Sequence, residues 1–142
     1  VGDLVEVTGL MNIYNGISSV DEVSLVEVKS SGNAITDAIA ITDLAAFRAG
    51  LTAADFGKRY VFTDLTILAT GYYAYFYEPT PGENRSGIVT SMSTDLITMT
   101  AGETVTFTAT LYGANGAFTT STKILRFSVT QASDYIITIP AP

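Results

Sequence analysis

The sequence predicts a mainly β domain with one short helical segment and a duplicated hairpin. Apolar and polar residues alternate along several segments, as they do in strands that bury one face. A stretch at the N-terminus recurs one hundred positions later, and both copies contain Asn-Gly, the dipeptide of tight hairpin turns. Hydrophobic residues form 47% of the 142 residues and charged residues 15%, which favours one folded domain over a disordered chain.

The repeat predicts hairpins over residues 1–30 and 101–130. One face of the first copy would carry Val5, Val7, Gly9, Met11 and Ile13, and the matching face of the second copy would carry Val105, Phe107, Ala109 and Leu111. The first return strand changes phase, which predicts a β-bulge. We expect both hairpins to share one core in a single domain over 1–142. Two modules divided near the Pro- and Gly-rich loop at 79–84 are the alternative.

A helical segment is expected between the two copies. Residues 41–50 predict a short helix with Thr42 or Asp43 as N-cap and Gly50 as the terminating residue. Residues 52–55 resemble a capping box and predict a second helical turn. The apolar residues that would face the core are Leu44, Phe47 and Leu51. We expect this segment to plug one open end of a barrel.

The order of the elements suggests a particular β architecture. Further strands are predicted at 59–68, 72–77, 87–91 and 135–139. Two strands with a tight turn, a third strand region, a short helix and two more strands give the order β-β-β-α-β-β, which is that of the OB-fold. The run 1–9, followed by Tyr14-Asn15-Gly16, resembles the opening of OB-like domains in bacterial surface lipoproteins and extracellular nucleases, and Leu111-Tyr112-Gly113 resembles a related segment. The resemblance implies an OB-like β-barrel.

Composition argues against catalysis. The chain has no Cys and no His, which excludes thiol nucleophiles, Ser-His-Asp triads and zinc ligation by those residues. Asp21 and Glu22 are neighbours, so on a strand they point to opposite faces and form no catalytic carboxylate pair. No Asp-rich calcium loop is present. We therefore expect no enzyme activity, no cofactor and no metal.

The candidate ligand-binding residues are tyrosines. Tyr73, Tyr75 and Tyr77 share one face of the predicted strand 72–77, while Tyr72, Ala74 and Phe76 share the other and are the better core candidates. An exposed tyrosine face would be a stacking platform for bases or sugar rings. Tyrosines that simply pack on the sheet are the alternative. Tyr14 and Tyr112 lie near the two Asn-Gly turns and would flank a groove, although turn chemistry alone also explains those turns.

These observations predict a non-catalytic binding or structural module of a bacterial extracellular or surface protein. The absence of Cys fits that location better than a small disulfide-rich domain. We expect a protein partner or self-association. An OB-type single-stranded nucleic-acid binder is the alternative, and a glycan ligand also stays open. A net charge of −7, with Lys58-Arg59 as the only adjacent basic pair, disfavours nucleic acid. No apolar run reaches the length of about 20 residues that a membrane helix needs, so no membrane insertion is expected.

Overall fold

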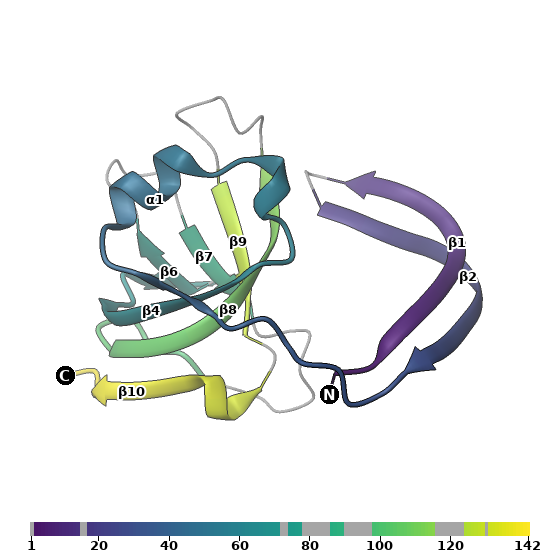
Figure 1. Ribbon diagram of the computed structural model, residues 1–142. Helices are drawn as coiled ribbons and strands as arrows, with labels where there is room; N and C mark the ends of the chain where they lie inside the picture. The colour runs from purple at the N-terminus through teal and green to yellow at the C-terminus, as the bar shows by residue number, and fades with distance from the viewer. Residues whose placement is uncertain are drawn as a thin grey trace.

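The computed structural model describes residues 2–14, 17–71, 74–77, 86–89, 98–115, 124–129 and 131–142. In this part of the chain the fold is mainly β, with a single α-helix (Figure 1). The predicted fold class is thus confirmed at that level. No helix within these ranges is long and apolar enough to cross a membrane.

The elements follow one another in a simple order. They are β1 (Leu4–Tyr14), β2 (Ile17–Ser30), β3 (Ile39–Ile41), α1 (Leu44–Gly50), the 3-10 helix η1 (Ala53–Asp55), β4 (Arg59–Thr66), β5 (Ala69–Thr70), β6 (Ala74–Tyr77), β7 (Ser86–Val89), β8 (Thr104–Asn115), β9 (Ile124–Ser128), the 3-10 helix η2 (Ala132–Asp134) and β10 (Tyr135–Ile139). Strands β4, β6, β7 and β10 lie where the sequence predicts them.

The hairpin β1–β2 stands beside the rest of the fold as a curved ribbon (Figure 1). Tyr14 pairs with Ile17, so only residues 15 and 16, which lie outside the described residues, join the two strands. Strand β2 meets β8 through the pairing of Ile17 with Gly113. We call the elements from β3 to β10 the body.

Strand β8 organises the body. It pairs antiparallel with β4, β9 and β10. Strand β9 pairs in parallel with β7, and the path continues through β6 to β5. The described strands do not form the closed barrel that the sequence predicts, because this path starts at β1 and ends at β5.

The core lies entirely in the body. Its buried members run from Leu51 to Tyr135, and Phe62 stacks on Phe107 with ring centroids 4.8 Å apart. Phe76 and Phe127 pack against Phe62 at 5.2 and 5.1 Å. The large apolar residues of β1 and β2 whose side chains are described are exposed instead. The expectation that both hairpins share one core is therefore wrong, because no described residue before Ile41 packs into it.

The helical segment forms largely as predicted. Asp43 is the N-cap of α1, and its carboxylate accepts a hydrogen bond from the Ala46 amide at 2.9 Å. Thr52 and Asp55 form the predicted capping box at η1. Leu51 is buried, while Leu44 and Phe47 are partly buried against the core, where they cover the inner face of the sheet. Gly50 is the last helical residue and Leu51 follows with a φ of −66°, so the expected glycine terminator does not form.

One expectation about a turn is wrong, and one alternative concerns a loop outside the described residues. Asn115 pairs with Ile124, so residues 116–123 connect β8 to β9 and Asn115-Gly116 does not close a two-residue turn. The loop at 79–84 lies outside the described residues, but β6 and β7 on either side of it pair with each other. A division into two modules at that loop stays a prediction.

Candidate binding surfaces

Many of the exposed large apolar residues in the described part of the chain lie on the hairpin β1–β2. Val5 pairs with Val28, Val7 with Val26 and Met11 with Val20, and directly opposed residues of an antiparallel pair share one face. We call these six residues and Ile13 the apolar hairpin face. All seven are exposed. Contiguous exposed apolar residues mark interaction sites more often than isolated ones do.

The opposite face of the hairpin is polar. Lys29 bridges Glu6 and Glu27, with N–O distances of 2.9 and 2.7 Å, and the hydrogen bonds to Glu27 and then Glu6 raise the pKa of Lys29. The Asn12 amide donates to the Asp21 carboxylate at 2.6 Å. Leu4, Leu10 and Leu25 are large apolar side chains on this face, and all three are exposed. The ribbon is thus amphipathic, because the salt-bridged face is polar and the apolar hairpin face is not.

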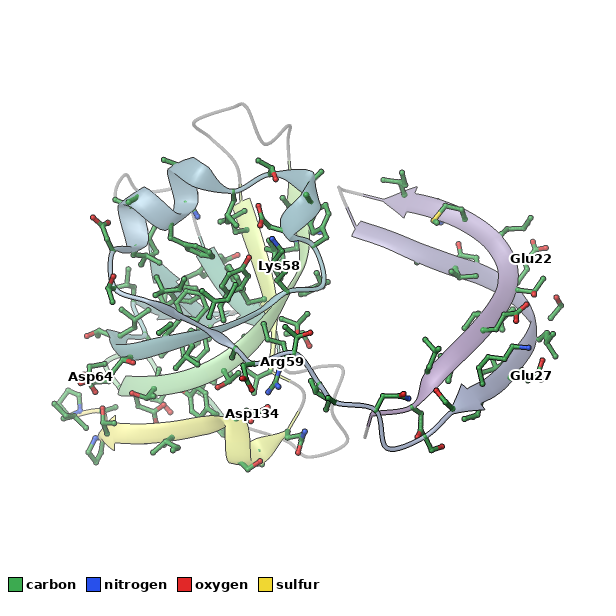
Figure 2. All side chains as sticks on the ribbon, in the orientation of Figure 1. Glu22, Glu27, Lys58, Arg59, Asp64 and Asp134 are labelled. Carbon is green, nitrogen blue, oxygen red and sulfur yellow. The ribbon has the colours of Figure 1, made fainter. Side chains whose placement is uncertain are left out.

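A bulge bends the ribbon. The register shifts between Thr8 and Leu10, and opposite this point Glu22 has a φ of +47°. Gly9 is required there, because a Cβ at this position would lie 2.6 Å from the Asp21 carbonyl oxygen. The bulge confirms the irregularity predicted for the return strand. Glu22 and Glu27 point to the outer, convex side of the arc (Figure 2).

The matching face of β8 is buried. Val105, Phe107, Ala109 and Leu111 have relative exposures of 0–2%, while Val5, Val7, Met11 and Ile13 have 42–73%. The two strands carry the same alternation, and they begin one hundred positions apart, at Leu4 and Thr104. Sequence reasoning found the alternation in both strands but did not identify the first as a binding surface, because alternation does not reveal whether a covering layer is present.

The aromatic strand β6 divides as the sequence predicts where it is described. Ala74 and Phe76 are buried, and Tyr75 and Tyr77 are half-buried on the other face. The Arg48 guanidinium lies over the Tyr77 ring, 4.9 Å from its centroid. Tyr72 and Tyr73 lie outside the described residues. Tyr77 thus packs in part against the body rather than standing free as a platform.

The predicted tyrosines that the structure describes lie on separate strands of the sheet. Tyr112 is half-buried on β8, and the strands β9 and β7 separate it from Tyr75 and Tyr77 on β6. Tyr14 ends β1, beyond β2 in the sheet order, and its side chain lies outside the described residues. A shared ligand groove built from all five tyrosines stays a prediction.

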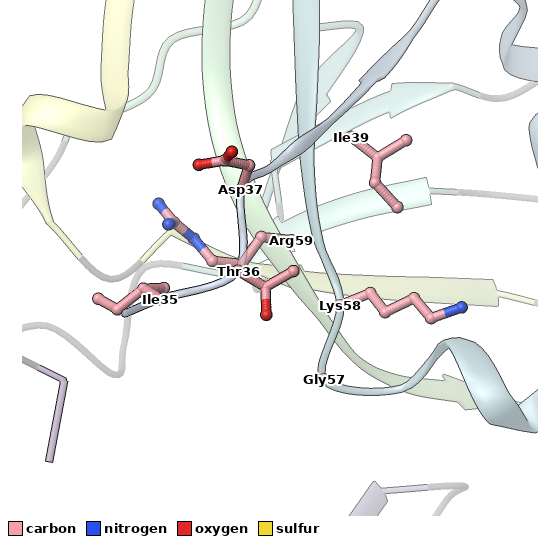
Figure 3. A pocket seen from close by; sticks show the side chains of 7 residues that line it. All are labelled: Ile35, Thr36, Asp37, Ile39, Gly57, Lys58 and Arg59. Carbon is pink, nitrogen blue, oxygen red and sulfur yellow. The ribbon is translucent and has the colours of Figure 1, made fainter. Parts of the chain in front are cut away.

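A small cavity lies where the chain enters the body (Figure 3). It has a volume of about 280 Å³ and is lined by Ile35, Thr36, Asp37, Ile39, Gly57, Lys58 and Arg59. Lys58 and Arg59 point in opposite directions (Figure 3). The only adjacent basic pair in the sequence therefore does not form a joint cationic patch.

The described basic side chains are engaged within the protein. Lys58 contacts Asp55 at 2.7 Å, and its hydrogen bond is the main cause that lowers the pKa of Asp55. Arg59 lies 3.7 Å from Asp134. Arg48 and Arg126 are buried, and burial lowers the pKa of Arg48. A phosphate group would have to compete with these internal interactions of the basic side chains.

A buried acid and a tyrosine fix the start of β8. Glu103 is buried; its carboxylate accepts hydrogen bonds from the Thr100 amide at 3.0 Å and from the Tyr135 hydroxyl at 3.3 Å. Burial, followed by the charge and hydrogen bond of Glu103, raises the pKa of Tyr135. Sequence reasoning missed this pair, since Glu103 and Tyr135 lie on segments that only the fold brings together.

Comparison with protein-family models finds no match, and comparisons with curated proteins and with solved structures find no significant similarity.

Proposed function

We propose that this chain is a non-catalytic, OB-like binding or structural module of a bacterial extracellular or surface protein, and that it associates with protein through the apolar hairpin face. The observation that carries the proposal is the pairing of seven exposed apolar residues on one face of β1–β2 with a salt-bridged polar face behind them. Covering such a face removes apolar area from water at about 25 cal/mol per Å².

The connectivity of the body supports an OB-like assignment. Strands β4, β8, β9, β7 and β6 are linked in that order by pairing. Just beyond β4, the Leu68 amide donates to the Tyr75 carbonyl of β6 at 2.7 Å. The path thus leads back to the chain next to β4, as expected for a partly open, five-stranded Greek-key barrel.

A protein partner fits the surface better than a nucleic acid. The apolar hairpin face has no charged residue, and a net charge of −7 opposes the approach of phosphates. Apolar surface with a polar surround is typical of protein interfaces. The absence of Cys agrees with a bacterial extracellular setting in which folding does not depend on disulfides.

Solution mass tests this proposal. Sedimentation of the 142-residue chain should show concentration-dependent association that persists at high salt, because apolar contacts are not screened by ions. The double variant Val7→Ser, Val26→Ser should shift the chain toward monomer.

The matched control removes apolar area from the other face of the same ribbon. The double variant Leu10→Ser, Leu25→Ser should associate as the unmodified protein does. A chain that stays monomeric at every concentration, or equal loss of association in both double variants, would contradict the proposed role of the apolar hairpin face.

A further inference from the structure

The start of β1 reproduces the start of β8 in backbone geometry as well as in sequence. Gly2 and Gly102, one hundred positions apart, have φ values of +82° and +94°. An acidic residue and a strand with the same alternation follow each glycine. The correspondence therefore includes the turn that leads into the strand.

The core that covers β8 includes Phe127 and Tyr135 from later in the chain, and residues from earlier in the chain pack on the same face of β8. This face meets Phe62 and Phe76, whose rings lie 4.8 and 5.2 Å from that of Phe107. Strand β4 supplies a pairing edge from Arg59 to Thr66. The helical segment adds Leu51 to the same core. Strand β4, Phe76 and the helical segment all precede β8 in the chain.

The turn before β8 is also hydrogen-bonded to the segment that follows β4. The Gly102 amide donates to the Ile67 carbonyl, and the Ile67 amide donates to the Glu103 carbonyl, both at 2.8 Å. At the first copy, the Gly2 carbonyl instead accepts from the backbone and side-chain amides of Asn33, each at 2.8 Å. The hairpin base is thus closed by the residues that follow it.

The curvature of β1–β2 is that of a strand pair wrapped around a core. The bulge at Gly9 bends the ribbon, and bulges bend strands where barrels close. Glu22 and Glu27 lie on the convex side (Figure 2), and Glu27 belongs to the polar face through its pairing with Glu6. The apolar hairpin face is therefore on the concave side, where a core would lie.

We infer that a strand-and-helix layer like that of residues 39–89 covers the apolar hairpin face. This layer belongs to the same polypeptide and precedes β1, just as residues 39–89 precede β8. The hairpin β1–β2 then closes one module, the segment 31–38 links it to the next, and the body is that next module. This inference rests on the proposed function and names its partner.

The sequence offers a direct test because it contains no Cys. Val7→Cys places one thiol on the apolar hairpin face, and Leu25→Cys places one on the polar face as a matched control. Both sites are exposed, so neither change should disturb folding. Each variant is made in the 142-residue chain and in the natural polypeptide with all residues that precede Val1, and labelling by a maleimide is timed in dilute protein. The natural polypeptide without either substitution gives the background.

The inference predicts that Val7→Cys reacts at least about ten-fold more slowly in the natural polypeptide than in the 142-residue chain, whereas Leu25→Cys reacts equally fast in both. Equal rates for Val7→Cys in the two forms would overturn it, as would a natural polypeptide with no residues ahead of Val1. Protection of Val7→Cys in the natural polypeptide that appears only as the protein concentration rises would also overturn it. That last result would identify a second copy as the occupant and leave the proposed function standing.

Discussion

Strands β1 and β8 carry the same pattern into opposite environments. Both alternate apolar and polar residues, both follow a glycine with positive φ, and both lead into an antiparallel partner. In β8 the apolar face is the centre of the core, whereas in β1 it faces water. The difference lies in the covering layer and not in the strand, so alternation predicts which face is to be buried but not what will bury it.

The largest expected effect is the difference in stability loss between substitutions at the matching positions Phe107 and Val7. Phe107→Ala should lower the free energy of unfolding by about 3–5 kcal/mol, because it opens a cavity among Phe62 and Phe76. Val7→Ala should change it by less than about 0.5 kcal/mol in dilute protein, because this side chain is already exposed. Chemical denaturation followed by circular dichroism suits a chain without Trp. Comparable losses in both variants would mean that the hairpin is covered in the isolated chain.

The two matching glycines give a smaller contrast. Gly102→Ala should destabilise the body by about 1–2 kcal/mol, because a φ of +94° is unfavourable for a residue with a Cβ. Gly2→Ala places a Cβ 2.4 Å from the Asn33 carbonyl oxygen, so the base of the hairpin must open. Hydrogen exchange should then rise in β1 and β2 while the unfolding midpoint of the body stays unchanged.

A neighbouring substitution serves as the control for both glycines. Ala101→Gly should leave both readouts nearly unchanged, since Ala101 is exposed. A loss of body stability in Gly2→Ala equal to that in Gly102→Ala would show that hairpin and body unfold as one unit.

The sequence predicted local features well because their causes are local. The capping box at Thr52 and Asp55 depends on residues three apart, and the inward direction of Ala74 and Phe76 follows from strand alternation. The shared core failed as a prediction, since it depends on which segments meet in space. The turn predicted at Asn115-Gly116 failed for a related reason. Asn115 pairs with Ile124, and this pairing depends on the rest of the sheet more than on the local dipeptide.

The candidate surface was harder to predict than the fold. The tyrosines attracted attention by composition, but Tyr75 and Tyr77 are half-buried. The valines of β1 and β2 resembled ordinary core residues. Their exposure is what distinguishes them from the buried matching residues in β8.

The smallest expected effect concerns the acidic residue that follows each glycine. Glu103 is buried and accepts a hydrogen bond from Tyr135, whereas Asp3, its counterpart in the first copy, is exposed. The raised pKa of Tyr135 means that the unfolded chain releases this proton near pH 10 while the folded body still holds it. The unfolded state then binds fewer protons, so the stability of the body is fully present below about pH 10 and falls as the pH rises above it. One proton changes the free energy of unfolding by at most about 1.4 kcal/mol per pH unit.

Denaturation between pH 8 and about pH 11 measures this loss in the unmodified protein and in Tyr135→Phe, which keeps the ring and removes the titrating hydroxyl. The variant should weaken less steeply with pH, and the remaining slope should come in part from Tyr60, whose pKa burial also raises. Hydrogen exchange in β1 and β2, compared at each pH after correction for the intrinsic rate, should show no matching change, because the hairpin has no counterpart of the Glu103–Tyr135 contact at Asp3. If the stability of the unmodified protein and that of Tyr135→Phe fell equally with pH, the Glu103–Tyr135 contact would not contribute to the alkaline loss. That result would contradict the proposed difference between the starts of β8 and β1.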